Sequence, residues 1–465
     1  MNQQPIRTAI LLAAGAGSKF WPYNVVRNKT AFPIANVPII RRLVDQLPGL
    51  GISQAIVVVE PGEASVRAAL RGCIASVQFV RQPVASGTAD ALLCAAQGLT
   101  EDFLVLAGDI VTAQSNLSRL LAHFAAHRPL ATALITPLNT PDHRERSEDW
   151  LIAFAEQGQL HGVEGHSRDG DFRFCGVYAM QPAALPYLRD NPGLLRVPVG
   201  GMPPLEAEIV QSLQLMVDEG QPVLTIETDG YFVDVDKPWH ILAANQQVIQ
   251  ALCASSMANH IPATCRIHDG AEINGHLVLG DHCEIGNRVV IKGDLWLGDH
   301  SRILNGAILD GPTVIGAQTL VQNYCQIGGH SALGPRGHYG HGAEFSGVAL
   351  ETVYCYHYCE IWGVVGAAVD FGAATVCGNL RFDDSASSWR IKGRAETPNH
   401  AANAAYFGDY MRTGVNAIIM PGRRLGVYSV VGPGVVLYDD LPDRQIVMLK
   451  QELTARPWGP ERYGW

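Results

Sequence analysis

The residues with the clearest chemical potential form a glycine-rich turn near the start of the chain. A β-strand predicted over Thr8–Ala13 runs directly into this turn, whose sequence is Ala-Gly-Ala-Gly-Ser-Lys. The small residues Ala13, Gly15 and Gly17 allow successive backbone N–H groups to approach phosphate oxygens, and Lys19 adds a positive charge. The pattern therefore suits a turn that wraps a nucleoside triphosphate, although a Gly-x-Gly sequence also occurs in plain tight turns.

The strand that carries this turn belongs to a first half in which short apolar runs alternate with longer segments of helical or turn character. The alternation predicts an α/β, Rossmann-like domain, with a largely parallel sheet and helices on both faces. The predicted strands are Thr8–Ala13, Ala55–Val59, Val77–Val80, Phe103–Leu106 and Leu130–Thr136. The domain closes with a strand over Tyr231–Val235, and Trp239–Ala251 is predicted to form a connecting helix.

A different periodicity governs the second half. From Ile261 to Phe345 an apolar or aromatic residue stands at every sixth position, and glycine often follows it, as in Ile285-Gly286. Such a rhythm arises when one side chain per flat face points inward and a turn separates successive faces. Three faces make one coil of a triangular prism, so the sequence predicts a left-handed parallel β-helix of hexapeptide repeats.

The repeat also defines the predicted domain boundaries. It slips near Glu351, returns at Val353, is interrupted by a polar insertion near 383–408 and resumes at Ile419. We therefore expect an α/β domain over 1–238, a connecting helix and linker over 239–260, a β-helix over 261–445 and a C-terminal tail over 446–465. Stacked coils leave flat faces to be covered, so a homotrimer assembled through the β-helix is the expected state.

Composition argues against several other classes of protein. The 465-residue chain is 47% hydrophobic and 17% charged, as is typical of a globular protein rather than a disordered one. Its formal net charge of −10 argues against a nucleic-acid-binding surface. No stretch approaches the roughly 20 apolar residues of a membrane span, and the start lacks the apolar core of a signal peptide. Ten scattered cysteines without a disulfide framework favour a reducing, cytoplasmic location.

The residues after the glycine-rich turn extend its pattern. Leu12–Pro22 is followed by Asn28–Ile40, which reads Asn-Lys-Thr-Ala-Phe-Pro-Ile-Ala-Asn-Val-Pro-Ile-Ile. Together they resemble the sugar-1-phosphate nucleotidyltransferase family, which includes UDP-N-acetylglucosamine, glucose-1-phosphate and mannose-1-phosphate pyrophosphorylases. Members of that family open with Gly-x-Gly-Thr-Arg and continue with a Pro-Lys-Pro-Leu element. Here Lys19 replaces the arginine, and Lys29 holds the position of the second motif's lysine.

Further landmarks resemble the family in the same order along the chain. The resemblance assigns substrate contacts to Ala13, Gly15, Gly17, Gln82, Gly87, Thr88, Glu164 and Gly176, and metal binding to Asp109 and Asp234. Gln82 and the loop at Gly87 correspond to the segment that contacts base and ribose, and the carboxylate of Glu164 corresponds to one that reaches the sugar. The segment Tyr231–Pro238 resembles the family's Trp-Met-Asp-Ile-Gly-Thr-Pro, and Asp234 corresponds to its carboxylate. On the sugar side, Gly165 stands where many members have a lysine, and Phe174 replaces a sugar-contacting asparagine.

These residue types suit the transfer of a nucleotidyl group. A sugar-1-phosphate oxygen attacks the α-phosphorus of a nucleoside triphosphate, and pyrophosphate leaves. Charge builds on both phosphoryl groups, so catalysis is mainly alignment and neutralisation. The resemblance implies that Asp109 and Asp234 hold Mg²⁺, a hard ion that takes carboxylate and phosphate oxygens. Lys19 is expected to neutralise the leaving pyrophosphate, and Lys29 the phosphates that meet in the attack.

The β-helix carries a second resemblance. The run Gly372–Asp384 reads Gly-Ala-Ala-Thr-Val-Cys-Gly-Asn-Leu-Arg-Phe-Asp-Asp, which resembles the C-terminal domain of bifunctional N-acetylglucosamine-1-phosphate uridyltransferases and their archaeal relatives. In that family the domain transfers acetyl from acetyl-CoA to glucosamine-1-phosphate with a histidine base, and His357 lies in the corresponding place. An imidazole can deprotonate an amine for attack on a thioester. Ser346, however, stands where the family has a lysine that binds the sugar phosphate.

Three functions are therefore considered. The preferred one is transfer of a nucleotidyl group to a sugar-1-phosphate, giving an NDP-sugar and pyrophosphate, with a UDP-N-acetylglucosamine-type reaction favoured. The first alternative is a bifunctional enzyme whose β-helix also carries acyl-CoA-dependent acyltransferase activity. The second is a non-catalytic regulatory or scaffold homologue, which the departures at Gly165, Phe174 and Ser346 favour. The base and the sugar stay open, since Gln82 suits uracil, thymine or guanine.

Overall fold

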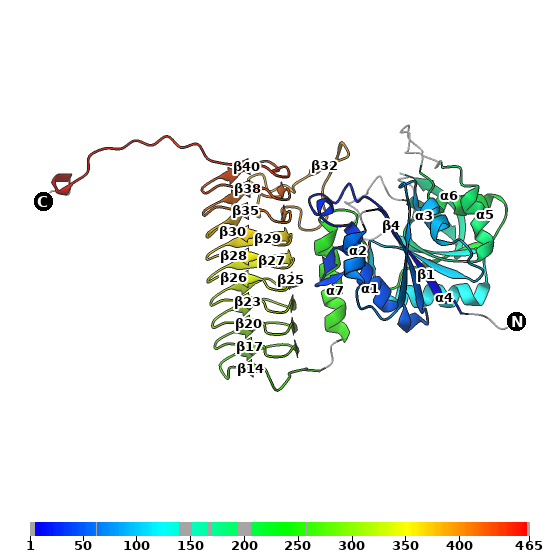
Figure 1. Ribbon diagram of the computed structural model, residues 1–465, viewed down its shortest axis with the longest axis horizontal. Helices are drawn as coiled ribbons and strands as arrows, with labels where there is room; N and C mark the ends of the chain where they lie inside the picture. The colour runs from blue at the N-terminus through cyan, green and yellow to red at the C-terminus, as the bar shows by residue number, and fades with distance from the viewer. Residues whose placement is uncertain are drawn as a thin grey trace.

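Two domains lie side by side in the computed structural model, which describes residues 5–61, 63–138, 151–165, 170–193, 206–255 and 258–462. Figure 1 shows an α/β domain beside a straight prism of stacked strands, with helix α7 (His240–Ser255) running between them. The predicted connecting segment over 239–260 thus contains a helix that continues beyond Ala251. Among the described residues, no helix is both long and apolar enough to cross a membrane.

The N-terminal domain is built on a nine-stranded sheet in the order β5-β4-β1-β6-β11-β8-β12-β10-β9. Its strands are β1 (Thr8–Ala13), β4 (Gln54–Val59), β5 (Ser76–Arg81), β6 (Phe103–Ala107), β8 (Ala131–Pro137), β9 (Leu151–Glu156), β10 (Gln159–Gly165), β11 (Phe172–Met180) and β12 (Val223–Glu227). Strands β5, β4, β1 and β6 are parallel, whereas β11 runs antiparallel to both β6 and β8. The parallel part of this mixed sheet therefore carries the glycine-rich turn.

Helices cover both faces of the sheet. One layer contains α1 (Ile39–Gln46), α2 (Ala64–Ala69) and α4 (Gln114–His127), and the other contains α3 (Thr88–Ala95), α5 (Leu185–Arg189) and α6 (Ile209–Asp218). Alternate residues of β1 divide between the two layers, because successive side chains of a strand point to opposite faces. Leu11 and Ala13 pack with the first layer, and Ile10 packs with the second.

The strand predicted over Tyr231–Val235 lies outside the main sheet. The observed strand, β13 (Phe232–Asp234), pairs antiparallel with β7 (Ile110–Thr112), and Asp234 is opposite Ile110. Since β7 directly follows the Gly108-Asp109 turn, this small ribbon brings the segment around residue 234 to the end of β6.

The C-terminal domain is a three-faced parallel β-helix. Ile267, Ile285, Ile303, Val321 and Tyr339 stack directly above one another, so one coil takes 18 residues and each face takes six. The inward side chains form one continuous core along the prism. This arrangement accounts for the six-residue period of the sequence.

The strands of the prism fall into three rows. The first contains β14 (Arg266–Ile267), β17 (Glu284–Ile285), β20 (Arg302–Ile303), β23 (Leu320–Val321), β26 (His338–Tyr339), β28 (Tyr354–Cys355), β30 (Asp370–Phe371), β35 (Arg412–Thr413), β38 (Val430–Val431) and β40 (Ile446–Val447). The second contains β15 (Glu272–Ile273), β18 (Val290–Ile291), β21 (Ile308–Leu309), β24 (Gln326–Ile327), β27 (Glu344–Ala349), β29 (Glu360–Val365), β31 (Val376–Cys377), β36 (Ile418–Ile419) and β39 (Val436–Leu437). The third contains β16 (Leu277–Leu279), β19 (Leu295–Leu297), β22 (Thr313–Ile315), β25 (Ser331–Leu333), the ends of β27 and β29, β34 (Ala405–Phe407) and β37 (Arg424–Leu425).

The slip of the repeat near Glu351 has a local cause. Strands β27 and β29 run through the corner between the second and third faces without a separate turn, so Tyr339 pairs with Cys355, only 16 residues on. Gly347 and Gly363 make the bend at φ of +126° and +143°. A Cβ atom on Gly347 would lie 2.0 Å from the carbonyl oxygen of Gly363, so glycine is required for this close stacking.

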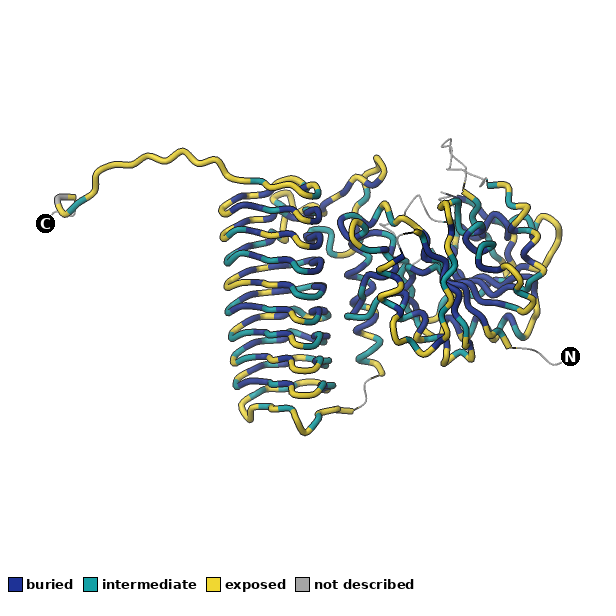
Figure 2. The backbone as a smooth tube through the Cα atoms, in the orientation of Figure 1, coloured by how far each residue is buried: buried dark blue, intermediate teal, exposed yellow. Residues whose placement is uncertain are grey.

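The third face of the prism packs against the N-terminal domain. An apolar cluster combines Phe20, Tyr23 and Phe32 with Val348 and Val364 of the prism. The Tyr23 hydroxyl donates to the Val364 carbonyl oxygen at 2.7 Å, and Arg27 forms a two-pronged ion pair with the fully buried Asp409. Figure 2 shows buried backbone on both sides of this contact.

The insertion predicted near 383–408 leaves the prism and returns to it. Strands β32 (Trp389–Ile391) and β33 (Arg394–Glu396) form an antiparallel hairpin that projects toward the N-terminal domain (Figure 1). The ring of Trp389 stacks on that of Trp239 with centroids 4.8 Å apart, and its indole N–H donates to the Gly422 carbonyl oxygen at 2.6 Å. The insertion is thus part of the contact between the domains.

Candidate functional site

A cavity of about 230 Å³ lies at the end of the parallel part of the sheet, next to the glycine-rich turn. Strands β1, β6, β11 and β13 and helices α3 and α6 all contribute to its wall. The lining residues are Leu12, Lys19, Thr88, Ala107, Asp109, Ile110, Leu151, Arg173, Phe174, Cys175, Gly176, Tyr178, Glu208, Ile209, Val210, Asp234 and Asp236. The cavity therefore brings together several of the residues that the sequence analysis selects.

The glycine-rich turn is held by a residue that the sequence analysis did not select. The side-chain amide of Asn28 donates to the carbonyl oxygens of Ala13 at 3.1 Å and Gly15 at 3.4 Å. Its side-chain oxygen accepts from the backbone N–H of Thr30 at 2.9 Å, which caps a short 3₁₀ helix beginning at Lys29. One buried amide thus fixes the turn and the segment that presents Lys29.

Four charged side chains meet at the mouth of the cavity. The Lys29 ammonium lies 2.6 Å from a carboxylate oxygen of Asp109 and 3.4 Å from one of Asp236. The other oxygen of Asp236 lies 3.2 Å from the Lys19 ammonium. Asp236 therefore bridges the two lysines that the sequence analysis assigned to the phosphates.

The backbone explains why the carboxylates converge. The N–H of Gly108 donates to the Leu12 carbonyl oxygen at 2.9 Å, and a Cβ atom at Gly108 would lie 2.6 Å from that oxygen. Glycine therefore lets the end of β6 approach the end of β1, and Asp109 follows at once. The N–H of Val235 donates to the Asp109 carbonyl oxygen at 3.0 Å, which keeps Asp234 and Asp236 beside it.

The electrostatics of the cluster follow from burial and close charges. Burial alone would lower the pKa of Lys29, but the carboxylates of Asp109, Asp236 and Asp234 outweigh it and raise that pKa above its ordinary value. Burial raises the pKa of Asp234, and the neighbouring Asp109 and Asp236 raise it further. Burial opposes ionisation of Asp236 as well, but Lys29 and Lys19 hold its pKa below the ordinary range. Crowded carboxylates of this kind are typical of a site that receives a cation.

Thr88 lines the cavity, and Gly87 directly precedes it in the chain. Gly87 has φ of +111°, and a Cβ atom there would lie 2.3 Å from the Ala207 carbonyl oxygen. The Thr88 hydroxyl donates to Glu208 at 2.5 Å and accepts from the Ile209 N–H at 2.9 Å. Burial raises the pKa of the Glu208 carboxyl. Thr88 therefore joins the start of α3 to the start of α6.

The structure places Gln82 behind this loop. Its side chain is buried, and its amide donates to Asp90 at 2.8 Å and to the Gly87 carbonyl oxygen at 3.3 Å. Gln82 thus braces the loop that carries Gly87 and Thr88. Its role in reading a base stays a prediction.

Only some of the positions predicted to contact the sugar line the cavity. Gly176 has φ of +69°, and a Cβ atom there would lie 2.7 Å from the Cβ atom of Ala107, so glycine is needed between β11 and β6. Phe174 lines the cavity in place of a polar side chain. Glu164 lies half-buried on β10 and is not among the described residues that line the cavity.

Three charged residues of this cavity escaped the sequence analysis. Arg173, Glu208 and Asp236 all line it. For Asp236 a signal was present, because the family segment Trp-Met-Asp-Ile-Gly-Thr-Pro has glycine at this position and threonine at the next. Arg173 precedes the segment of Phe174 and Gly176 but matches no motif residue itself, and Glu208 lies outside any motif, so only the fold shows that both line the site.

The second family departure in that segment, Lys237, connects the site to the prism. Its ammonium pairs with Glu396 of the insertion hairpin, and its side chain is only 1% exposed. The ammonium also lies 5.6 Å from the ring centroid of Trp239. The residue after Asp236 is therefore anchored to the other domain.

The β-helix residues of the second resemblance lie at different corners of the prism. His357 is exposed on the turn between β28 and β29, and its carbonyl oxygen accepts from the Ala374 N–H at 2.8 Å. Ser346 lies on β27, before the bend at Gly347, beside Trp362 of the next coil. Ser346 lines two cavities together with Trp362, and His357 is not among the described residues that line either of them.

Comparison with known proteins adds to this geometry. Residues 8–145 match the family described as "Nucleotidyl transferase". A "Bifunctional protein GlmU" of Methanococcus maripaludis strain C7 is 29% identical over 450 residues, which cover 96% of this chain and 98% of that protein. A "Bifunctional sugar-1-phosphate nucleotidylyltransferase/acetyltransferase" of Sulfurisphaera tokodaii is 24% identical over 438 residues, covering 93% and 98%. A solved UDP-glucose pyrophosphorylase complexed with UDP-glucose has a TM-score of 0.46 and 16% identity, covering 53% of this chain and 99% of that one.

Most of the first half of the chain, including the glycine-rich turn and Asp109, is thus similar to the nucleotidyl transferase family. Over almost its whole length, the chain is similar to proteins that are named as bifunctional.

Proposed function

We propose that this protein is an enzyme that transfers a nucleotidyl group from a nucleoside triphosphate to a sugar-1-phosphate, giving an NDP-sugar and pyrophosphate. The observation that carries the proposal is the cluster of Lys29, Asp109, Asp236 and Lys19 at the mouth of a cavity beside a glycine-rich turn. A scaffold that only kept the fold would have no need to hold two carboxylates and two ammonium groups together, because buried charges are costly.

The positions of the residues support the following roles. Backbone N–H groups of the turn around Gly15 and Gly17 face the triphosphate, and Lys19 neutralises the pyrophosphate as its bond to the α-phosphorus breaks. Lys29 neutralises the phosphates at the point of attack, where the sugar-1-phosphate oxygen forms the new bond. Arg173 lines the same cavity, and its positive charge supports the binding of phosphates there.

Mg²⁺ is the cofactor proposed for this site. Asp109 and Asp234 would hold it, and the raised pKa of Asp234 beside two other carboxylates fits a place that a cation stabilises. The described residues contain no set of three or more histidine, cysteine or acidic side chains arranged to hold a metal by themselves. Two carboxylates with phosphate oxygens are the usual environment of Mg²⁺, which supplies charge neutralisation to the phosphates when bound.

Within the class of sugar-1-phosphates, a UDP-N-acetylglucosamine-type reaction is favoured. The names of the archaeal relatives support a bifunctional sugar-1-phosphate enzyme. A relative from Streptomyces griseus, 25% identical over 289 residues that cover 58% of this chain and 76% of that protein, is named "Glucose-1-phosphate thymidylyltransferase". The base and the sugar are therefore to be decided by assay.

We further propose that three chains associate through the prism and that the protein works in a reducing, cytoplasmic environment. Exposed apolar side chains on the prism, among them Ile418, Val436 and Tyr438, support the association, because such surface is typical of an interface. All ten cysteines are free, which supports the reducing environment.

The test is release of pyrophosphate by the full-length protein. Each of the common nucleoside triphosphates is combined with glucose-1-phosphate, N-acetylglucosamine-1-phosphate or mannose-1-phosphate in the presence of Mg²⁺. We expect release with one preferred pair, and the same reaction run with Lys29→Ala should be strongly reduced. No release with any pair would favour the regulatory or scaffold homologue instead.

A further inference from the structure

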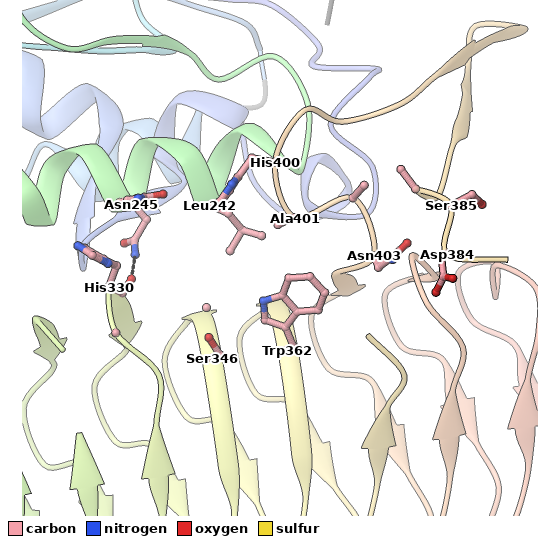
Figure 3. Close-up of a pocket in the computed structure, with 15 residues that line it drawn as sticks. Leu242, Asn245, His330, Ser346, Trp362, Asp384, Ser385, His400, Ala401 and Asn403 are labelled. Atoms are coloured by element: carbon pink, nitrogen blue, oxygen red, sulfur yellow. Dashed lines mark hydrogen bonds between the residues drawn. The ribbon is translucent and has the colours of Figure 1, made fainter. Parts of the chain in front are cut away.

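A second and larger cavity, of about 560 Å³, lies where the two domains and the insertion meet. Figure 3 shows its three walls. Leu242 and Asn245 come from α7, Ser346 and Trp362 from the prism, and the remaining wall from the two ends of the insertion. None of its lining residues belongs to the nucleotidyl-transfer cavity, so it is a separate site.

The chemistry of the lining is polar and aromatic. Figure 3 shows the ring of Trp362 standing between the helix and the insertion, with Ser346 on the neighbouring strand and His400 above it. The full lining is Leu242, Asn245, Gln246, Gly329, His330, Ser346, Gly347, Trp362, Asp384, Ser385, Ala386, His400, Ala401, Ala402 and Asn403. Hydroxyl, amide, imidazole and carboxylate groups thus surround one large indole.

The charge of the lining is unusual for a protein that handles sugar phosphates. No lysine or arginine occurs among the described residues that line this cavity. Its one carboxylate, Asp384, repels anions, and burial lowers the pKa of His330, which disfavours the charged form of that imidazole. A phosphate dianion brought here would therefore lack a fixed positive partner.

Hydrogen bonds hold the walls of the cavity in place, so the space is not a defect in side-chain packing. The Asn245 amide donates to the His330 carbonyl oxygen at 2.6 Å, while its side-chain oxygen accepts from the Ala35 N–H at 3.0 Å, so helix, prism and N-terminal domain are fixed around one wall. On the opposite wall Asn403 accepts from the N–H and hydroxyl groups of Ser387 at 3.0 and 2.7 Å, which holds the two ends of the insertion together. Rigid walls at a domain boundary are the usual setting of small-molecule sites.

We propose that this interdomain cavity binds an uncharged, unphosphorylated sugar. Its volume suits a monosaccharide with water, and volumes of this order are typical of small-ligand sites. The indole of Trp362 offers an apolar face to the C–H groups of a pyranose ring, while Asp384, His400 and Ser346 offer partners to its hydroxyl groups. The inference goes beyond nucleotidyl transfer and does not depend on it.

The test measures direct binding to the full-length protein by saturation-transfer NMR and calorimetry. The probes are N-acetylglucosamine and glucose, added without nucleotide. The variants Asp384→Asn and His400→Ala each remove one hydroxyl partner from an exposed position, so the fold is retained. Asp439→Asn removes an exposed carboxylate elsewhere on the β-helix and serves as the matched control.

We expect saturable binding of at least one of the two sugars, weakened about tenfold or more in each cavity variant and unchanged in the control. Glucose-1-phosphate should displace the bound sugar more weakly than the unphosphorylated sugar does. Absence of saturable binding would overturn the proposal, and so would binding that the two cavity variants leave unchanged. Equal displacement by the 1-phosphate would overturn the exclusion of phosphate.

Discussion

Lys237 and Glu396 form a buried ion pair that joins the nucleotidyl-transfer site to the β-helix. Lys237 directly follows Asp236, which contacts both Lys19 and Lys29, and Glu396 lies on the hairpin of the insertion. The segment that supplies two of the site's carboxylates is thus held in place from the other domain. The β-helix is therefore part of the framework of the site as well as a domain in its own right.

The first prediction follows from this pair. Glu396→Gln should lower the free energy of unfolding by about 3 kcal/mol, because it removes the counter-charge of a buried ammonium group. The double variant Lys237→Met/Glu396→Leu should regain much of that loss, since replacing both partners by apolar groups removes the unpaired charge. Urea denaturation of the full-length protein measures both values.

A surface pair provides the control for this prediction. Arg302 and Glu284 form an ion pair at 2.7 Å with side chains that are 52% and 35% exposed. Glu284→Gln should change the free energy of unfolding by less than about 1 kcal/mol, because water screens such pairs. If Glu396→Gln has as small an effect as Glu284→Gln, the interdomain pair does not stabilise the site.

The prediction for the metal site concerns Asp109. Asp109→Asn should reduce turnover about a hundredfold or more, because loss of a contact to the reacting phosphates costs about 3 kcal/mol of transition-state stabilisation. The same loss should appear in the parent protein when Mg²⁺ is removed with a chelator and should be reversed by adding it back. Pyrophosphate release at saturating Mg²⁺ measures both effects, and near-normal turnover of Asp109→Asn would refute the assignment.

Some features of this protein are encoded in the local sequence, whereas others depend on contacts that only the fold creates. The six-residue period predicts the prism because it reflects one coil directly, and Tyr339 stacking on Val321 and Ile303 is its physical origin. The position of Lys29 was predictable because a motif surrounds it. Its partner Asp236 was not selected, although it departs from the family segment, because its contact with Lys29 spans 207 positions of the chain.

In the sheet and the insertion too, the sequence predicts the elements but not which elements pair with one another. Strands β1 and β4 were predicted within a residue of their bounds, since buried parallel strands are continuous apolar runs. The pairing of β13 with β7 outside the main sheet was not, because a short strand carries no signal for its partner. The stacking of Trp389 on Trp239 likewise joins two segments, and neither local sequence predicts this contact.

The role of Asp236, which stands where the family segment has glycine, can be tested by substitution. Asp236→Gly restores the residue that the family segment has at this position, and Asp236→Asn keeps the shape of the side chain without its charge. We expect both variants to lose about tenfold or more in kcat/KM for the nucleoside triphosphate, because Lys19 and Lys29 lose a shared carboxylate. Steady-state kinetics decide the matter. An unchanged kcat/KM in both variants would mean that Asp236 merely fills space.

The state of association gives a prediction that is independent of activity. Ile418 and Val436 project from adjacent coils of one face and are 39% and 40% exposed. If this face lies in a trimer interface, Ile418→Arg/Val436→Arg should sediment as a smaller species than the parent, because unpaired charges are costly in an apolar contact. Ile74→Arg, at an 89% exposed position of the N-terminal domain, is the control and should sediment like the parent. A monomeric parent would exclude the trimer.

The last prediction concerns acyl transfer by the β-helix. Such a reaction needs a base, an anchored amine acceptor and a thioester close to both. His357 offers an exposed imidazole, but Ser346, in the position of the family's phosphate-binding lysine, carries no charge. A charge-assisted contact contributes about 1.5–3 kcal/mol, so its absence weakens acceptor binding by roughly ten- to a hundredfold. We therefore expect little or no thiol release when acetyl-CoA and glucosamine-1-phosphate are mixed with the full-length protein.

Ser346→Lys should increase the release if His357 is a competent base, and Ser346→Lys/His357→Ala should abolish that increase. Strong release by the parent that disappears in His357→Ala would show that the acceptor is anchored without the lysine, and would establish His357 as the base.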